Sequence, residues 1–286
     1  MRRGGLPGHM AKARRIAREK VGLVDMVLEV VDARAPLATH SVDADALAER
    51  KPRLLIMSHS DLAAPMSTSK WLSYWQQQNV YAFAIDAVRG EGLGPLQTHL
   101  KRAGMGLNER LAERGRRHRP LRAIVIGLPN VGKSSLLNRL TRGKAKARTG
   151  AKPGITRGEQ WLRSGNIELL DLPGMLPVQA GDTDAARILQ TVGILSLDRF
   201  DAVELCTWLL KEGLGHQTEE IASGVGISYR PGEEMEFLRS FAVSRGRLAS
   251  GGRPELEDAA LQFARGLQQG KWGRFTLEEP PHDGEL

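Results

Sequence analysis

Six short segments within the first 170 positions have the pattern of strands, most of them apolar runs, and amphipathic or polar segments separate them. Runs of this length, bounded by turn residues, are typical of β-strands, and their alternation with helical patterns predicts a mainly parallel sheet covered on both faces. In sheets of this class, ligands bind beyond the carboxyl ends of the strands. The predicted strands are Val24–Val31, Arg53–Met57, Val80–Ile85, Arg122–Ile126, Glu159–Arg163 and Ile167–Leu170.

From about Gly181 the alternating pattern stops and apolar residues recur at helical spacing. No group of side chains suited to catalysis stands out there. The stretch TEEIASGVGIS resembles a helix-turn-helix, but two short helices joined at glycine occur in any helical domain, so we expect no DNA partner. The predicted helices are Asp184–Leu195, Ala202–Lys211, Thr218–Ser223, Glu233–Arg245 and Glu255–Gln269.

The length of 286 residues suits two domains. We expect a first domain over residues 1–178, in which a linker at 104–120 joins the halves 1–103 and 121–178. An all-α domain follows over 179–275. The acidic, proline-containing end, 276–286, has the composition of a disordered tail.

Composition places the chain among soluble cytoplasmic proteins. No run approaches the 18 or more apolar residues of a membrane span, so we expect no membrane partner. The start, MRRGGLPGHM, lacks the apolar segment of a secretory signal, although a transit peptide stays open. The single cysteine, Cys206, lies in an apolar run and is expected to be a buried thiol in a reducing compartment. We expect a monomer.

Positive charge is concentrated in three places. The formal net charge is +8 and the pI near 9.9. Residues 1–20 hold seven Lys or Arg against Glu19 alone, 139–157 hold seven with no acidic residue, and RGRRHRPLR spans 114–122. This distribution favours a polyanionic partner, while the alternative is that these segments are solvated faces and a linker.

A phosphate-binding loop lies between the fourth predicted strand and a helix. In GLPNVGKSSLLNRL, Gly127, Gly132, Lys133 and Ser134 match GxxxxGK[ST]. Backbone N–H groups from Asn130 to Ser135, with those of Val131 and Gly132 among them, would face phosphate oxygens at the helix N-terminus. Lys133 would reach the β- and γ-phosphates, and the Ser134 hydroxyl would bind Mg²⁺.

Two further elements of a nucleotide switch follow. The sixth predicted strand ends in Asp171-Leu-Pro-Gly174, where the carboxylate can hold the metal through water and the Gly174 N–H can face the γ-phosphate. Between the motifs lies the basic segment RGKAKARTGAKPGITRG, in which Thr156 is placed to give Mg²⁺ a second hydroxyl. We interpret this segment as a switch loop that orders around a triphosphate.

The guanine reader, Asn/Thr-Lys-x-Asp, is absent from its usual place after Asp171. The two lysines beyond Asn166, Lys211 and Lys271, are not followed by aspartate two places on. Upstream, Ser58-His59-Ser60-Asp61 ends one predicted strand and AFAIDAVRGEG, with Ala87, ends another. The two base loops therefore precede the phosphate loop, and the order of parts is permuted.

With this permutation the chain resembles the YlqF/RbgA family, ribosome biogenesis GTPase A, over nearly its whole length. The resemblance rests on LPGHMAKARR, VDMVLEVVDARAPL, GLPNVGKSSLLNRL, AKPGITRGEQW, DLPGM and GKWGRFTLEE. It implies a circularly permuted P-loop GTPase domain of α/β class, then a small helical domain that docks on ribosomal RNA. It implies GTP/GDP and Mg²⁺ as ligands, and a GTP-hydrolysing assembly factor for the large ribosomal subunit, switched by nucleotide.

Two departures from the family pattern concern the guanine base. Ser58 and His59 stand in place of Asn-Lys, and Ala87-Val88 in place of a Ser-Lys pair. Ser58 is too short to tie the loops together as asparagine does, whereas His59 can stack on the purine and the Ala87 N–H can read the guanine oxygen. Asp61 keeps the carboxylate. The alternative is a nucleotide-indifferent or hydrolysis-deficient RNA-binding scaffold.

The hydrolytic machinery also departs from the usual GTPase. Met175 follows the Asp-x-x-Gly motif where many GTPases have glutamine, so intrinsic turnover should be slow. The resemblance implies that another group or the ribosome completes the site, and His9 matches a histidine proposed for that role; it is otherwise a surface or capping residue. Asn130 resembles the asparagine that coordinates K⁺ in cation-activated relatives, or it only holds a turn.

Overall fold

The structure is a computed structural model that describes residues 15–16, 19–48, 51–141, 160–172, 183–199 and 201–281. These residues fall into two compact units. Unit 1 contains the described residues within 1–60 and 71–179, and unit 2 those within 61–70 and 180–286. Across all these ranges, no helix is both long and apolar enough to cross a membrane.

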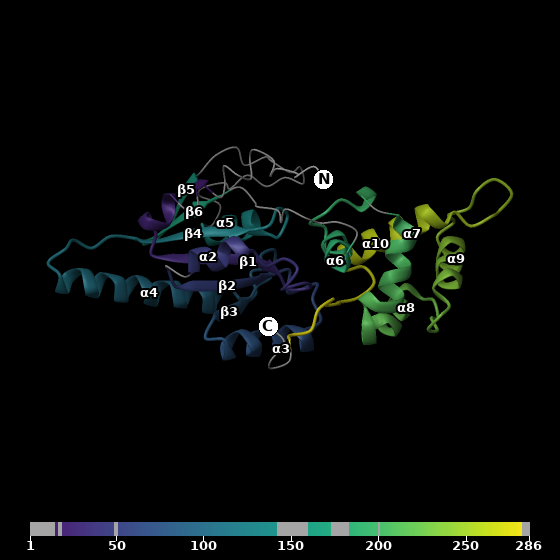
Figure 1. Ribbon diagram of the computed structural model, residues 1–286, viewed down its shortest axis with the longest axis horizontal. Helices are drawn as coiled ribbons and strands as arrows, with labels where there is room; N and C mark the ends of the chain where they lie inside the picture. Colours follow the sequence, from purple (N-terminus) through teal and green to yellow (C-terminus); the bar gives the residue numbers. More distant parts are fainter. Residues whose placement is uncertain are drawn as a thin grey trace, which may run out of the picture. The chain divides into compact units, whose positions relative to one another are not determined.

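Unit 1 is built on a six-stranded sheet with the order β3-β2-β1-β4-β6-β5 (Figure 1). Every neighbouring pair is parallel except β5 and β6, which are antiparallel. All six predicted strands are confirmed, with ends that differ by no more than two residues. They are β1 Met26–Asp32, β2 Arg53–Ser58, β3 Tyr81–Ala84, β4 Leu121–Gly127, β5 Gln160–Ser164 and β6 Ile167–Asp171.

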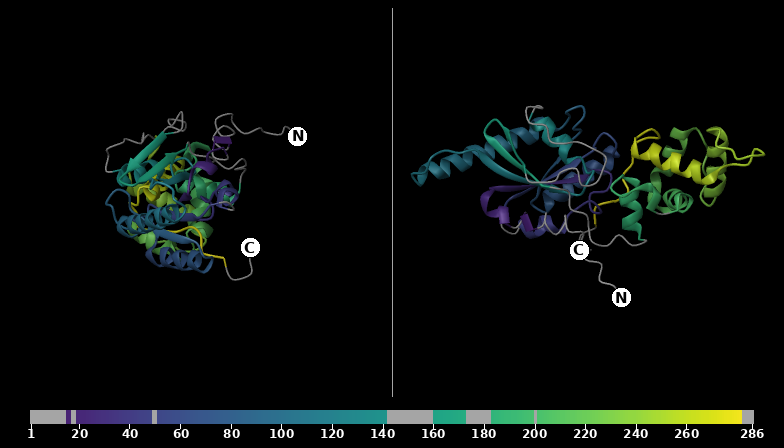
Figure 2. Two further views of the ribbon diagram at one scale, coloured as in Figure 1. Left: turned by 90° about the vertical axis from the view of Figure 1, so that its left-hand side faces the viewer. Right: turned by 90° about the horizontal axis from the view of Figure 1, so that it is seen from above.

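Helices cover both faces of this sheet, as the continuous apolar runs predicted (Figure 2). Gly104 of α4 (Leu93–Glu113) packs near Leu121 on one face of β4. Ile124 and Ile126 point to the other face, where they share a cluster with Leu47 of α2 (Val42–Ala48). The other described helical elements of unit 1 are η1 Val21–Leu23, α3 Pro65–Gln77, whose first six residues belong to unit 2, and α5 Lys133–Leu140.

Unit 2 is helical, and its five predicted helices are confirmed. Helix α6 stops at Thr191, short of the predicted Leu195, because Gly193 turns the chain with a φ of 84°. A short π-helix, η3 (Leu209–Gly213), continues the helix that begins at Ala202. The elements are α6 Asp184–Thr191, η2 Leu197–Arg199, α7 Ala202–Trp208, η3, η4 Gly215–Gln217, α8 Thr218–Val225, α9 Glu234–Ser244 and α10 Leu256–Gln268.

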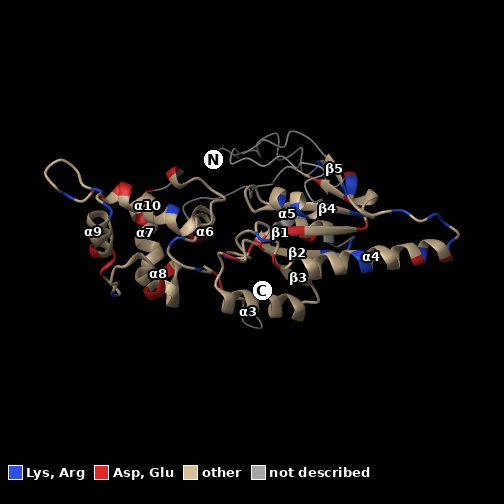
Figure 3. Cartoon of the chain, turned by 180° about the vertical axis from the view of Figure 1, so that it is seen from behind, with Lys and Arg blue, Asp and Glu red and all other residues tan. Residues whose placement is uncertain are grey.

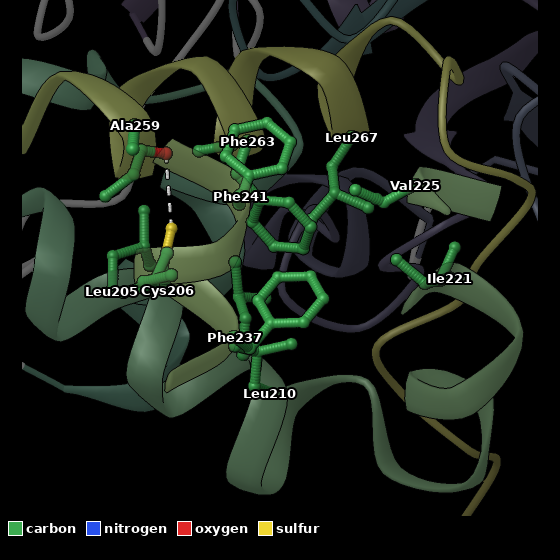
Figure 4. Close-up of a cluster of buried hydrophobic side chains, with 14 of the residues drawn as sticks. Leu205, Cys206, Leu210, Ile221, Val225, Phe237, Phe241, Ala259, Phe263 and Leu267 are labelled. Atoms are coloured by element: carbon green, nitrogen blue, oxygen red, sulfur yellow. Dashed lines mark hydrogen bonds between the residues drawn. The ribbon is translucent and has the colours of Figure 1, made fainter. Parts of the chain in front are cut away.

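Aromatic side chains fill the core of unit 2 (Figure 4). Phe237, Phe241 and Phe263 are fully buried, and Phe263 meets the other two rings edge-on at centroid distances of 5.4 and 5.7 Å. Cys206 lies in this core and donates to the Ala260 carbonyl at 3.2 Å. Burial raises the pKa of its thiol, and the predicted buried thiol is confirmed.

The segment expected to begin a disordered tail is instead anchored in unit 2. The Thr276 N–H donates to Gln217 Oε1 at 2.8 Å, and the Gln217 amide donates back to the Thr276 carbonyl at 2.8 Å. Farther on, Glu279 lies 3.0 Å from Lys70 Nζ. Composition missed this anchoring because it depends on partners about 60 and 200 residues away.

A buried ion-pair network joins β1 to β2 in unit 1. Glu29, in the middle of β1, is fully buried and accepts from the Ser41 N–H at 2.9 Å. His40 Nδ1 lies 2.7 Å from Glu29, and His40 Nε2 lies 2.8 Å from Asp45. Arg53 reaches both carboxylates, at 3.3 and 2.7 Å. Burial acts to lower the pKa of His40, but its hydrogen bonds and the charges of Glu29 and Asp45 outweigh burial and raise it.

The raised pKa of His40 predicts how stability depends on pH. A histidine whose pKa is higher in the folded state adds stability in full below its unfolded pKa, about 6.5, and loses it as pH rises through the folded value. The free energy of unfolding of the wild type should therefore exceed that of His40→Gln most near pH 6. The difference should shrink toward pH 8.5 in urea titrations at both pH values. A difference that is constant or grows with pH would contradict this assignment.

Candidate nucleotide-binding site

The candidate site lies where parallel strands of unit 1 end side by side. In the sheet register, Gly127 of β4 lies opposite Val30 of β1, and Ser58 of β2 lies opposite Asp32 of β1. On the other side of β4, Asp171 at the end of β6 lies opposite Val125. Segments far apart in sequence are thus brought together at the carboxyl ends of the parallel strands, as the strand pattern predicted.

The phosphate loop has the backbone shape that its glycines permit. Gly127 has a φ of 150°, and a Cβ there would lie 2.4 Å from the Val30 carbonyl oxygen, so no larger residue fits. Asn130 and Gly132 have φ values of 60° and 93°. Helix α5 begins at Lys133, and the N–H groups of Gly132, Lys133 and Ser134 donate to no group in the described part of the chain. They are the donors that a phosphate takes at a helix start.

Lys133 and Asp171 are buried charges that influence each other across this loop. Lys133 is 8% exposed, and its ammonium donates to the carbonyls of Gly127 (2.9 Å) and Leu128 (2.7 Å). Burial lowers the pKa of Lys133 to about 8, against the opposite effect of Asp171. Burial likewise raises the pKa of Asp171 to about 6, opposed by Lys133. A phosphate beside Lys133 and a cation beside Asp171 would each offset the cost of burying these charges.

Ser58 ties the base loop to the phosphate loop, which corrects the expectation that it is too short. Its hydroxyl lies 2.6 Å from the Val131 carbonyl and 2.8 Å from the Val31 carbonyl, and it can donate to either. Gly132 approaches closely, since a Cβ at that position would lie 3.2 Å from Ser58 Cβ. The close approach of backbone to side chain lets the short hydroxyl span a gap that sequence reasoning assigned to a longer side chain.

His59 is held by a buried carboxylate that sequence reasoning left without a role. Its Nδ1 lies 2.8 Å from Asp32 Oδ2, and its backbone adopts a φ of 53°. Asp32 is fully buried and also accepts two hydrogen bonds from the Arg34 guanidinium, at 2.9 and 2.8 Å. Burial acts to raise the pKa of Asp32, but Arg34 and His59 hold it well below the usual range. An ionised carboxylate only accepts, so Nδ1 carries the ring hydrogen.

The Asp32–Arg34 pair had one signal in the sequence. Asp-x-Arg directly after an apolar strand is suited to a turn in which a carboxylate binds a nearby guanidinium, and Asp32 also accepts from the Arg34 N–H at 2.9 Å. The link from this turn to His59, 27 residues away, had no local signal.

The second base loop is shaped by Asp86. Its Oδ1 accepts from the N–H groups of Val88 (2.7 Å) and Arg89 (3.0 Å). Ala87 is half-buried, and its N–H donates to no described residue. This N–H is the donor predicted for the guanine oxygen, and it is available to a ligand. Val88 is 80% exposed.

The remaining predicted residues fall in three classes. Asn130 and Ser135 are exposed and Ser134 is half-buried on the phosphate loop and α5. Asp61 is half-buried and is the first residue of the segment assigned to unit 2. His9, Thr156 and Gly174 lie outside the described residues.

The described oxygen donors fit a Mg²⁺ ion that is shared with phosphate. Asp171 is 3% exposed and its carboxylate makes no hydrogen bond to a described residue, and the loop motif supplies the half-buried hydroxyl of Ser134. Among the described residues there is no group of three or more His, Cys, Asp or Glu that could hold a metal alone. Mg²⁺ usually takes one or two carboxylates and completes its shell with phosphate and water.

Comparisons with known proteins find GTPases that are similar over nearly the whole chain. A sequence model of the 50S ribosome-binding GTPase family matches residues 122–225. The chain is 35% identical to ribosome biogenesis GTPase A of Priestia megaterium, covering 96% of each chain, and 34% identical to that of Thermotoga maritima, covering 96% and 93%. The crystal structure of GNP-bound YlqF from T. maritima matches with a TM-score of 0.63, 29% identity and coverage of 94% of this chain and 98% of that one.

Proposed function

The chain belongs to the family of ribosome biogenesis GTPase A, and from this membership we propose that it binds and hydrolyses GTP as an assembly factor for the large ribosomal subunit. The observation that carries the proposal is the meeting of Lys133, Asp171 and Ser58 at neighbouring strand ends of unit 1. Nucleotide would control the factor as a switch on ribosomal RNA. The helical unit 2 would dock on that RNA.

The phosphate contacts follow from the loop geometry. The free N–H groups from Val131 to Ser135 would bind phosphate oxygens, and Lys133 would leave its two carbonyls for the β- and γ-phosphates. Ser134 and Asp171, joined by Thr156, would hold Mg²⁺, which neutralises charge that develops on the phosphates. The Gly174 N–H would face the γ-phosphate.

Guanine recognition would use the two permuted base loops. Asp61 would accept from the two donors on the Watson–Crick edge of guanine, and the open Ala87 N–H would donate to the guanine oxygen. His59, fixed by Asp32, would stack on the purine. Because Ser58 already ties the loops, base discrimination does not need the family's asparagine.

Hydrolysis would depend on groups supplied when the ribosomal particle binds. Met175 cannot hydrogen-bond the attacking water, so intrinsic turnover is slow. We assign the activating role to His9, and a K⁺ ion on Asn130 would add positive charge near the transferring phosphoryl group. The protein would act as a cytoplasmic monomer.

The decisive experiment is nucleotide hydrolysis with and without purified large ribosomal subunits. We expect slow GTP turnover alone, clear stimulation by subunits, and little turnover of ATP. His9→Ala should keep GTP binding and lose the stimulation, and replacing K⁺ by Na⁺ should lower the stimulated rate if Asn130 binds the ion. Binding to subunits without turnover, or equal use of GTP and ATP, would instead favour the scaffold with degenerate base recognition.

A further inference from the structure

Helix α4 and the loop after it form an arm that extends beyond the sheet of unit 1 (Figure 1). The helix has 21 residues, so it is about 30 Å long. Its buried residues end at Leu107, and Arg110 and residues 112–118 are exposed. We call residues 101–118 the α4 arm. Part of it lies in the segment that the sequence assigned to a linker.

The α4 arm is rich in basic residues, and Lys and Arg are blue on the cartoon of Figure 3. Against them stand only two acidic side chains in the arm, Glu109 and Glu113. None of the basic side chains forms an ion pair or hydrogen bond with a described residue, although many other Arg residues of the chain do. The set, all exposed, is Lys101, Arg102, Arg110, Arg114, Arg116 and Arg117.

The base of the arm is fixed, so its tip is held in a defined place on unit 1. Arg119 makes a bidentate pair with Asp25, at 2.7 and 2.8 Å, and its N–H donates to Asn108 at 3.0 Å. At the tip, Gly115 turns the chain with a φ of 65°, and the Arg116 N–H donates to the Leu111 carbonyl at 2.8 Å. A solvated, mobile linker would not need these contacts.

The charge exceeds what the helix itself uses. A basic residue in the last turn stabilises the helix dipole, and Arg110 serves that purpose. Arg114, Arg116 and Arg117 follow the end of the helix, where their mutual repulsion lowers stability when nothing neutralises it. Three exposed arginines within four residues are therefore explained better by a ligand than by the fold.

We propose that the α4 arm binds backbone phosphates of ribosomal RNA, with Arg114, Arg116 and Arg117 as its main contacts. The planar guanidinium matches a phosphate with two parallel hydrogen bonds. A protein partner is less suited, because residues 114–118 offer none of the apolar surface that forms the centre of protein interfaces. This inference rests on the proposed function for the identity of the polyanion.

The side of the arm toward the sheet has a different character from the tip. A groove of about 970 Å³ lies between α4 and the β5–β6 hairpin. Its walls are mainly apolar, with Leu100, Met105 and Ile167 among them, and its charged residues are Lys101, Glu109 and Arg163. The proposed phosphate contacts are therefore confined to the exposed tip and outer side of the arm, and the groove is a separate surface.

The test removes the three tip charges with Arg114→Gln, Arg116→Gln and Arg117→Gln in one protein. Its dissociation constant for purified large ribosomal subunits, and for protein-free large-subunit RNA, is measured from about 0.05 to 0.3 M salt. We expect affinity to fall about tenfold or more near 0.1 M salt. The slope of log K against log salt should lessen by about 2 to 3, because each lost phosphate contact removes 0.7 to 0.9.

A charge-matched control separates the arm from net charge. It combines Lys51→Gln, Lys70→Gln and Arg230→Gln, three residues at separate sites outside the three basic segments of the sequence. Equal weakening of binding by both triple variants would overturn the inference. So would an arm variant that binds subunits more weakly but binds protein-free RNA as the wild type does, because that result would indicate contact with a ribosomal protein. A wild type that binds neither particle nor RNA overturns the proposed function itself. Unchanged intrinsic GTP turnover shows that the arm variant is folded.

Discussion

Replacing Lys133 by Met should lower GTP affinity at least about 100-fold, equivalent to about 2.7 kcal/mol, and abolish measurable turnover. The ammonium of Lys133 is positioned at the phosphate loop by the Gly127 and Leu128 carbonyls. When GTP binds, the ammonium would exchange these neutral carbonyls for charged phosphate oxygens, which form stronger hydrogen bonds. Methionine has no positive charge to offer the phosphates. Equilibrium titration with labelled GTP measures the affinity, and single-turnover hydrolysis measures the rate.

The same substitution should leave the empty protein about as stable as the wild type. The pKa of Lys133 is lowered to about 8, so at pH 7 its buried charged form lowers the stability of the folded protein. Methionine removes this cost, but it also removes the two hydrogen bonds of the ammonium, and the two effects oppose each other. An unchanged unfolding temperature together with lost binding would show that Lys133 serves the ligand. Lys70→Gln, at an exposed lysine, is the control and should retain affinity. GTP binding that survives Lys133→Met would exclude this loop as the phosphate site.

Local pattern predicted the fold well because the central strands β1, β2 and β4 of unit 1 are almost entirely buried. Such runs have clear ends, and the phosphate loop between β4 and α5 has glycines at Gly127 and Gly132 where the backbone requires them. The permuted order of the base loops was also visible, because it depends on which motifs are present and in which order. Each of these motifs is encoded within a few neighbouring residues, so it can be recognised without the structure.

Contacts between distant residues could not be predicted in the same way. Ser58 reaches Val131 across 73 positions, and its role depends on how closely Gly132 packs rather than on side-chain length. The Asp32 carboxylate that orients His59 is 27 positions away from it. The basic run at 114–122 was plain in the sequence. Only the structure shows that Arg119 and Arg122 are paired, with Asp25 and Glu168, whereas the arginines at the tip of the α4 arm are exposed.

Replacing Gly224 by Ala should destabilise unit 2 by about 3 kcal/mol, the upper range for adding a methyl group where there is no room. Gly224 lies in α8, where alanine would ordinarily stabilise the helix by up to about 1 kcal/mol. Here a Cβ would lie 2.0 Å from the Trp272 carbonyl oxygen, and a backbone atom cannot move aside as a flexible side chain does. The expected change therefore has the opposite sign to the helix propensity.

The clash is severe because Trp272 is fixed from several sides. Its indole N–H donates to the Phe263 carbonyl at 2.9 Å, and its ring meets Phe241 edge-on at 5.8 Å. Gly94→Ala is the matched control, since no atom lies within 4 Å of a Cβ there and α4 should gain slightly. Urea unfolding gives the size of each effect, and hydrogen exchange at α8 and α10 shows whether the loss falls in unit 2. If Gly224→Ala were as stable as Gly94→Ala, α8 would not pack against Trp272, and the tryptophan of the GKWGRF motif would have another role.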